Sequence, residues 1–144
     1  MIHTNFRVIE YGSPEWETSV RLREEILRIP LGSTFSAEEL AEEKNHIHIA
    51  GFIDDAIIAT VALVPEEDCM KMQRVVVAVN LRNQNIGTEM MKFCEQYILG
   101  TSIKRIYCHA RNTAVNFYRN NGYTQIGDYF DEDGIPHLMM QKEL

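Results

Sequence analysis

The chain has 144 residues, the length of one domain, and 45% of them are apolar and 24% charged. This composition is typical of a globular domain and excludes a disordered tail, a collagen-like fibre and a low-complexity segment. Twenty-one acidic side chains against fourteen basic ones give a net charge of −7. An acidic chain is repelled by phosphate backbones, so a general nucleic-acid binder is disfavoured and no nucleic-acid partner is expected.

The cysteines and the hydropathy pattern indicate the compartment. Cys69, Cys94 and Cys108 are odd in number and widely spaced, and they form no CxxC pair, so a reducing cytoplasm fits best. Residues 1–10 lack the apolar core of a signal peptide, and no run of 18 apolar residues is present. Without a linker or repeat, residues 1–144 are predicted to form one soluble, cytoplasmic domain with no membrane partner.

The first half of the chain predicts a strand, two helices and three more strands. Ser13 can cap the first helix, and Pro30 ends it. The pattern Ser36–Glu39 is a capping box for the second helix. The apolar run Val75–Val79 is typical of a strand covered on both faces. The expected elements are a strand at 6–11, helices from 14 and from 36 to about 44, and strands at 46–53, 56–64 and 69–79.

The second half alternates helices and strands. An apolar stripe that includes Ile86, Met90 and Ile98 predicts a helix, which Gly100 terminates. Further on, the pattern predicts strands at 103–108, 123–129 and 135–141, a helix at 113–121 and a turn at 131–134. The order β-α-α-β-β-β-α-β-α-β-β predicts a mixed α/β (α+β) domain with a central sheet of about seven strands, flanked by about four helices.

The segment 82–88 carries the clearest sign of a ligand site. A buried strand leads through Arg82-Asn83-Gln84-Asn85-Ile86-Gly87 directly into a helix, whose first N–H groups lack partners within the helix and attract anions. Gly87 and Asn85 both tolerate the positive φ of a tight turn. A Walker loop needs a lysine after the glycine, and a dinucleotide fingerprint needs more glycines. The segment therefore predicts either an anion cradle or a plain connection with a glycine cap.

Two motifs resemble those of the GNAT N-acyltransferases. The run from Arg82 to Gly87 is similar to the family's coenzyme-A pyrophosphate motif, [Gln/Arg]-x-x-Gly-x-[Gly/Ala], with Asn85 in place of a glycine. Asn112-Thr113-Ala114-Val115-Asn116-Phe117-Tyr118, followed by Gly122-Tyr123, is similar to the family's N-x-x-A-x-x-F-Y…G-[F/Y] segment. The element order also matches the family's fold along nearly the whole chain.

The resemblance implies an enzyme with a GNAT-like fold, most like the ElaA-like branch, which the segment 131–137 and Leu31-Gly32 resemble. Such an acyltransferase moves an acetyl group from acetyl-CoA to a primary amine of a small molecule or peptide, by direct attack while both are bound. Homodimers are frequent among proteins of this resemblance. Since Asn85 departs from the motif, the alternative is a sensor or assembly module that binds acyl-CoA without turnover.

For the cofactor, the resemblance implies a diphosphate on the segment 82–88 and pantetheine along the valine strand. That strand must then splay from strand 103–108, so that free backbone groups remain for pantetheine and for the thioester carbonyl. The implied cofactor-binding residues are Val75, Val76, Val77, Arg82, Asn83, Gln84, Asn85, Ile86, Gly87, Thr88, Asn112 and Asn116.

The resemblance makes Tyr118 the acid that protonates the departing thiolate, a transfer that a phenol pKa near ~10 and a thiol pKa near ~8.5 allow. The base that accepts the proton of the incoming ammonium is open. His137 is the first candidate because it follows a turn at the end of the sheet, and His48 and Glu25 are alternatives. Each of these side chains also has an ordinary explanation, in packing or as a surface residue. His46 and His48 lack a convincing third ligand, so no metal is expected.

Overall fold

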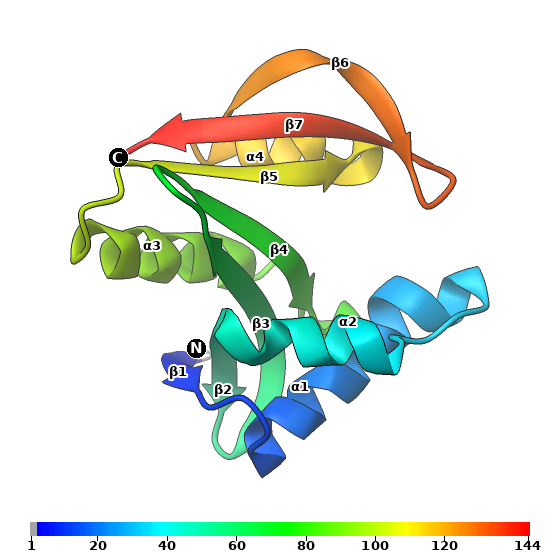
Figure 1. Ribbon diagram of the computed structural model, residues 1–144. Coiled ribbons are helices and arrows are strands. Elements are labelled where there is room, and N and C mark those ends of the chain that lie inside the picture. Colours follow the sequence, from blue (N-terminus) through cyan, green and yellow to red (C-terminus); the bar gives the residue numbers. More distant parts are fainter. Residues whose placement is uncertain (1–2) are drawn as a thin grey trace.

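The protein is described by a computed structural model that covers residues 3–144, so Met1 and Ile2 of the predicted domain lie outside the described part. One seven-stranded mixed sheet runs through it in the order β1-β2-β3-β4-β5-β7-β6 (Figure 1). The strands are β1 (Asn5–Ile9), β2 (Ile47–Ile53), β3 (Ala56–Pro65), β4 (Met70–Val77), β5 (Arg105–Arg111), β6 (Thr124–Glu132) and β7 (Ile135–Glu143). The helices are α1 (Pro14–Arg23), α2 (Ala37–Glu42), α3 (Ile86–Leu99) and α4 (Val115–Asn120).

Short helical turns join these elements. A π-helical turn, η1 (Glu24–Arg28), and a 3-10 turn, η2 (Ile29–Leu31), continue α1, and η3 (Glu43–Asn45) follows α2. Two more 3-10 turns, η4 (Val79–Leu81) and η5 (Asn112–Ala114), precede α3 and α4. The predicted fold class and element order are therefore confirmed, with boundaries that shift by a few residues.

The predicted helix starts agree with the structure. The Ser13 hydroxyl accepts a bond from the Trp16 N–H at 3.2 Å, and both bonds of the Ser36 capping box form. Three details were wrong. The first helix changes to a π-helical turn at Glu24 instead of continuing to Pro30. The turn predicted at 131–134 contains only Asp133 and Gly134, both at positive φ, because β6 continues through Glu132.

The third prediction that was wrong concerns the apolar run Val75–Val79, which was expected to be a strand covered on both faces. The strand ends at Val77, and Val79 lies in η4 with 65% of its surface exposed. Val75 and Val77 are half-buried instead of fully covered. A continuous apolar run does not distinguish a strand packed on both faces from a strand that borders a cavity.

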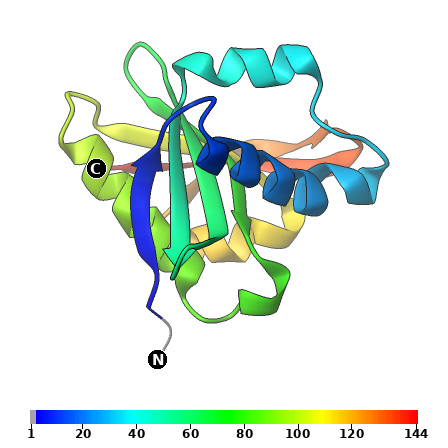
Figure 2. The same ribbon diagram turned by 90° about the horizontal axis from the view of Figure 1, so that it is seen from below.

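The sheet splits at its centre, as the resemblance requires. The parallel pair β4–β5 is joined only by Met70–Met72 with Ile106–Cys108, and residues 73–77 pair with β3 alone. The two strands diverge beyond that point (Figures 1 and 2). The edge of β4 that faces β5 therefore offers unpaired backbone groups, which need partners from elsewhere.

A β-bulge lies in β4 at this split. Val61 of β3 faces both Arg74 and Val75, and Arg74 has a φ of 58°, in the left-handed region. The bulge reverses the alternation of the strand. Before it, Met72 packs against α3, whereas after it Val75 and Val77 pack on that side. As a result the Arg74 side chain extends to the opposite face, toward α2.

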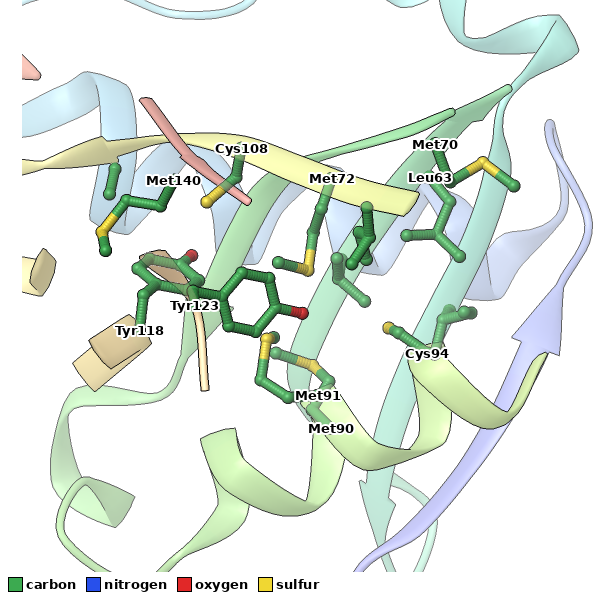
Figure 3. Close-up of a cluster of buried hydrophobic side chains, with 14 of the residues drawn as sticks. Leu63, Met70, Met72, Met90, Met91, Cys94, Cys108, Tyr118, Tyr123 and Met140 are labelled. Carbon is green, nitrogen blue, oxygen red and sulfur yellow. The ribbon is translucent and has the colours of Figure 1, made fainter. Parts of the chain in front are cut away.

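Apolar side chains cover both faces of the sheet. The larger core joins β3, β4, β5 and β7 to α3 and α4, with methionine, cysteine and tyrosine side chains at its centre (Figure 3). A smaller core joins α1 to β1 and β2 through Ile9, Trp16, Val20 and Phe52.

Candidate active site

A cavity of about 1200 Å³ passes through the split in the sheet. On the α3 and α4 side its wall is formed by β4, η4 and the two helix starts, including Val77, Gly87 and Phe117. On the other side it is lined by η1, α2 and the ends of β5, β6 and β7, including Leu27, Arg111 and His137. Because the gap joins the two halves, two molecules bound from opposite sides can meet in it.

The loop before α3 has the shape of an anion cradle. Asn83 and Asn85 take φ values of 65° and 62°, and Asn85 directly precedes the helix without capping it through its side chain. Asparagine is among the few residues that adopt this conformation readily. The first N–H groups of α3 therefore stay available to a ligand and carry the positive end of the helix dipole. Arg82 lines the same end of the cavity.

Gly87 is required for a packing reason. A Cβ at this position would lie 2.9 Å and 3.0 Å from two ring carbons of Phe117. The lack of a side chain lets the start of α3 pack directly against the aromatic ring of α4. The two predicted motifs thus meet in space, since Gly87 belongs to the first and Phe117 to the second.

Tyr118 lies at the base of the split. It is 5% exposed, lines the cavity, and packs beside Cys108 and Tyr123 (Figure 3). Burial, reinforced by the Cys108 thiol, raises the pKa of its hydroxyl well above the usual value. Tyr118 therefore keeps its proton at neutral pH, as a proton donor must.

Two histidines share one carboxylate on the other side of the split. His109 Nδ1 donates to Glu132 Oε1 at 3.0 Å, and His137 Nε2 lies 3.4 Å from Glu132 Oε2. The Nδ1–H of His137 donates to the Ile135 carbonyl at 2.8 Å, which directs Nε2 toward Glu132. Burial by itself would raise the pKa of Glu132, but the hydrogen bond from His109 and the nearby positive charges lower it. The group therefore presents a negative charge with an adjacent proton acceptor.

A charged wall closes this half of the cavity. Arg28 makes two hydrogen bonds to Glu39, and this pairing lowers the pKa of Glu39 to about 2. Arg74 approaches Glu39 to 3.7 Å, and its guanidinium lies over the ring of Phe35, 4.7 Å from the centroid. Arg28 packs against the same ring at 4.3 Å. The π-helical turn η1 supplies Arg28, a common role for such turns at functional sites.

Most of the predicted cofactor-binding residues line the cavity, namely Val75, Val76, Val77, Arg82, Asn83, Asn85, Ile86, Gly87 and Thr88. Both predicted catalytic residues, Tyr118 and His137, also line it. Gln84, Asn112 and Asn116 do not line the cavity, and all three side chains are exposed. Asn120 and Asn121 line the cavity instead.

The structure also separates the three candidate bases. His48 is buried beneath η3, where its Nε2–H donates to the Glu43 carbonyl at 2.8 Å, and Glu25 is exposed. Neither lines the cavity, so only His137 of the three is placed at the site. Sequence reasoning did not single out Glu132 or Arg111 as site residues. Each lies near the carboxyl end of its strand, β6 and β5, and this was the available signal.

The cysteines are not poised for nucleophilic catalysis. All three are buried, and burial raises the pKa of Cys94 and of Cys108 to about 12. Within residues 3–144, no group of three or more His, Cys, Asp or Glu side chains is arranged to hold a metal ion. No helix in the described part of the chain is long and apolar enough to span a membrane.

The geometry defines a class of protein. An anion-binding helix start suits the diphosphate of a nucleotide, and the unpaired edge of β4 suits an amide-bearing arm that leads from it into the split. These features fit coenzyme A. A cavity lined by residues from both sides of the split sheet, with a buried proton donor in its wall, indicates an acyl-CoA-dependent transferase.

The comparisons identify the family. The family model described as acetyltransferase (GNAT) domain matches residues 30–144, and the chain belongs to this family of acyltransferases, which use acetyl-CoA. The curated protein ElaA of Escherichia coli K12 is 30% identical over 101 residues, which cover 67% of this chain and 66% of ElaA. The chain thus spans slightly less than two thirds of that relative, and the likeness supports the ElaA-like branch.

Solved structures share the fold. The crystal structure of E. coli ElaA has a TM-score of 0.80 at 22% identity, covering 96% of this chain and 99% of that one. An acyl-CoA N-acyltransferase from Pseudomonas aeruginosa has a TM-score of 0.82 at 19% identity, covering 97% and 99%. An aminoglycoside 6'-N-acetyltransferase solved with coenzyme A has a TM-score of 0.81 at 16% identity, covering 96% of each chain.

Proposed function

We propose that this protein is an N-acetyltransferase that moves the acetyl group of acetyl-CoA to a primary amine, by direct attack while both substrates are bound. The observation that supports this most is the cavity through the split sheet, which joins a cofactor half to a second, charged half. The amine belongs to a small molecule or a peptide. A cytoplasmic location and a homodimer stay predictions.

The backbone would hold the cofactor. We assign the diphosphate to the N–H groups of the loop and the first turn of α3, from Arg82 to Thr88, and pantetheine to the unpaired edge of Val75–Val77. Acetyl-CoA, when bound, supplies an activated thioester carbonyl. We assign the polarisation of that carbonyl oxygen to an N–H of the same edge.

Two side chains would move the protons. Tyr118 holds the proton that we assign to the departing sulfur, since burial keeps the phenol neutral. His137 Nε2 receives the proton of the attacking ammonium, and Glu132 stabilises the resulting imidazolium from 3.4 Å. Glu132 also attracts the ammonium into this half of the cavity.

Thiol release from acetyl-CoA across a panel of amines tests the proposal. We expect Tyr118→Phe to lower kcat about 100-fold or more with little change in affinity for coenzyme A. Tyr129→Phe is the matched control, because that tyrosine is 53% exposed on β6. Unchanged turnover in Tyr118→Phe would show that the acid is assigned wrongly.

The cofactor site has its own test by calorimetry. Gly87→Glu should abolish coenzyme-A binding, because it adds bulk against Phe117 and a negative charge beside the diphosphate. Arg82→Glu adds the charge without the steric conflict and should weaken binding in the same direction. Unchanged affinity in both variants would remove the cofactor from this loop. Tight binding without amine-dependent thiol release would indicate the sensor function instead.

A further inference from the structure

The cavity carries a charge opposite in sign to that of the chain. Five basic side chains line it against three acidic ones, although the net charge of the protein is −7. The basic residues are Arg28, Lys71, Arg74, Arg82 and Arg111, and the acidic ones are Glu39, Glu132 and Asp133. Arg82 lies at the loop assigned to the cofactor diphosphate. The other four basic side chains are therefore left to the half that receives the acceptor.

Two of these four cations are already engaged. Arg28 is held by both oxygens of Glu39, and Arg74 lies between Glu39 and Glu43 at 3.7 Å and 3.9 Å. Among residues 3–144, Lys71 and Arg111 form no such ion pair, and of these two only Arg111 is held at the cavity wall by a side-chain hydrogen bond. Its Nη2 donates to the Leu27 carbonyl at 3.2 Å, and among residues 3–144 no carboxylate lies within 4.0 Å of it.

This arrangement fixes Arg111 but leaves most of its donors free. A guanidinium has five N–H groups in a planar fork that matches the two oxygens of a carboxylate. The bond to Leu27 uses one of them and orients the side chain at the cavity wall. Arg111 is therefore positioned in advance for an anionic ligand.

Arg111 is also adjacent to the groups that would handle the amine. It faces His137 directly across the β5–β7 ladder, and His137 Nε2 in turn lies 3.4 Å from Glu132. Directly opposed residues of antiparallel strands have Cα atoms about 4.5–5.5 Å apart. A cation that binds anions thus lies one strand away from His137, and the carboxylate of Glu132 lies on the next strand beyond, on the same wall of the cavity.

We infer that the acceptor is a zwitterion of the α-amino acid type, whose carboxylate binds Arg111 while its ammonium faces Glu132 and His137. An α-amino acid carries its two charged groups on the same carbon, which suits Arg111 on β5 and His137 on the adjacent strand β7, with Glu132 beside His137. Ile26 and Leu27 line the same half and favour an apolar side chain. The inference rests on the proposed acetyl transfer and makes Arg111 its specificity-determining residue.

Matched substrate pairs test the inference. Leucine is compared with 3-methylbutylamine, which lacks only the carboxylate, and with leucinamide, which lacks its charge. We expect the wild-type kcat/KM to favour leucine about 10- to 100-fold, the usual effect of hydrogen bonds to a charged group. Arg111→Gln should raise the KM for leucine by the same factor and leave the KM for the amine unchanged. Arg111→Lys should retain part of the preference.

Arg119→Gln is the control, because Arg119 is exposed on α4 and bonds only Gln125 among the described side chains. Calorimetry of leucine binding to the coenzyme-A-loaded protein measures the contribution of Arg111 to leucine affinity without turnover. Equal use of leucine and the amine by the wild type, or equal slowing of both by Arg111→Gln, would overturn the inference and leave acetyl transfer intact. Absence of thiol release with every amine would instead overturn the proposed function, and leucine binding unaffected by Arg111→Gln would overturn the inference by itself.

Discussion

Replacing Glu43 with alanine is expected to destabilise the protein severely. Glu43 is fully buried at 0% exposure, and its two oxygens accept bonds from Arg23 at 2.7 Å and 2.8 Å and from Trp16 Nε1 at 3.1 Å. Arg23 is itself 1% exposed, so the variant leaves a buried guanidinium without a partner. Breaking such a pair costs about 3–5 kcal/mol.

This loss in the free energy of unfolding can be expressed as a decrease in the melting temperature. At about 2.1 cal/mol/K per residue, 144 residues give an unfolding entropy of about 0.3 kcal/mol/K, so Tm should fall by about 10–17 °C. Circular dichroism during heating measures the change. Glu42→Ala, at the exposed neighbouring position, should shift Tm by less than about 2 °C.

A double variant separates the charge from the packing. Arg23→Met combined with Glu43→Leu removes both charges and retains volume, so it should recover most of the loss. A Tm drop below about 3 °C for Glu43→Ala, or a double variant as unstable as the single one, would refute the reasoning. The second result would mean that the lost hydrogen bond to Trp16, and not the unpaired charge, determines the cost.

Three further predictions concern the loop, the thiols and pH. Asn85→Gly should retain both the stability and the coenzyme-A affinity, because glycine adopts a φ of 62° freely. Asn85→Val should lower the free energy of unfolding by about 1–2 kcal/mol and weaken coenzyme-A binding. Thermal melting measures the stability and calorimetry measures the affinity. Cys94 and Cys108, with pKa values raised to about 12, should react with a thiol reagent at pH 8 only after denaturant is added, and fast labelling of the native protein would contradict their burial. Arg28 lowers the pKa of Glu39 to about 2, so this pair stabilises the fold above the unfolded pKa of about 4.3 and its contribution disappears as pH falls from there toward 2. Acid titration of Tm should therefore decline less steeply in Glu39→Gln, and an identical decline would rule out this pairing.

The fold was predictable where each boundary has a local signal. Ser13 and Ser36 cap their helices, and the hydrophobic period changes clearly where β2 begins. The bulge at Arg74 has no such signal, since the residues around it read as an ordinary strand. In the left-handed region Arg74 contacts Phe35 and Glu39, and these contacts between distant segments form only in the folded protein.

The half of the candidate site that we assign to the cofactor could be predicted from the sequence, because its residues lie in two continuous segments of the chain. The loop to Gly87 and the Tyr118 segment are contiguous motifs, and the structure brings them to one cavity. The acceptor side depends on which distant elements meet. Arg111 bonds Leu27 across 84 positions of sequence, and Glu132 reaches His109 across 23. Neither pairing follows from periodicity or composition.

The narrow junction between β4 and β5 has a mechanical consequence. Three residue pairs, Met70–Met72 with Ile106–Cys108, are the whole hydrogen-bonded seam between the two halves of the sheet. In the proposed binding mode, coenzyme A lies along the open edge and bridges the two halves of the sheet. Because a ligand that binds only the native state raises its stability with ligand concentration, Tm should then increase with the concentration of coenzyme A.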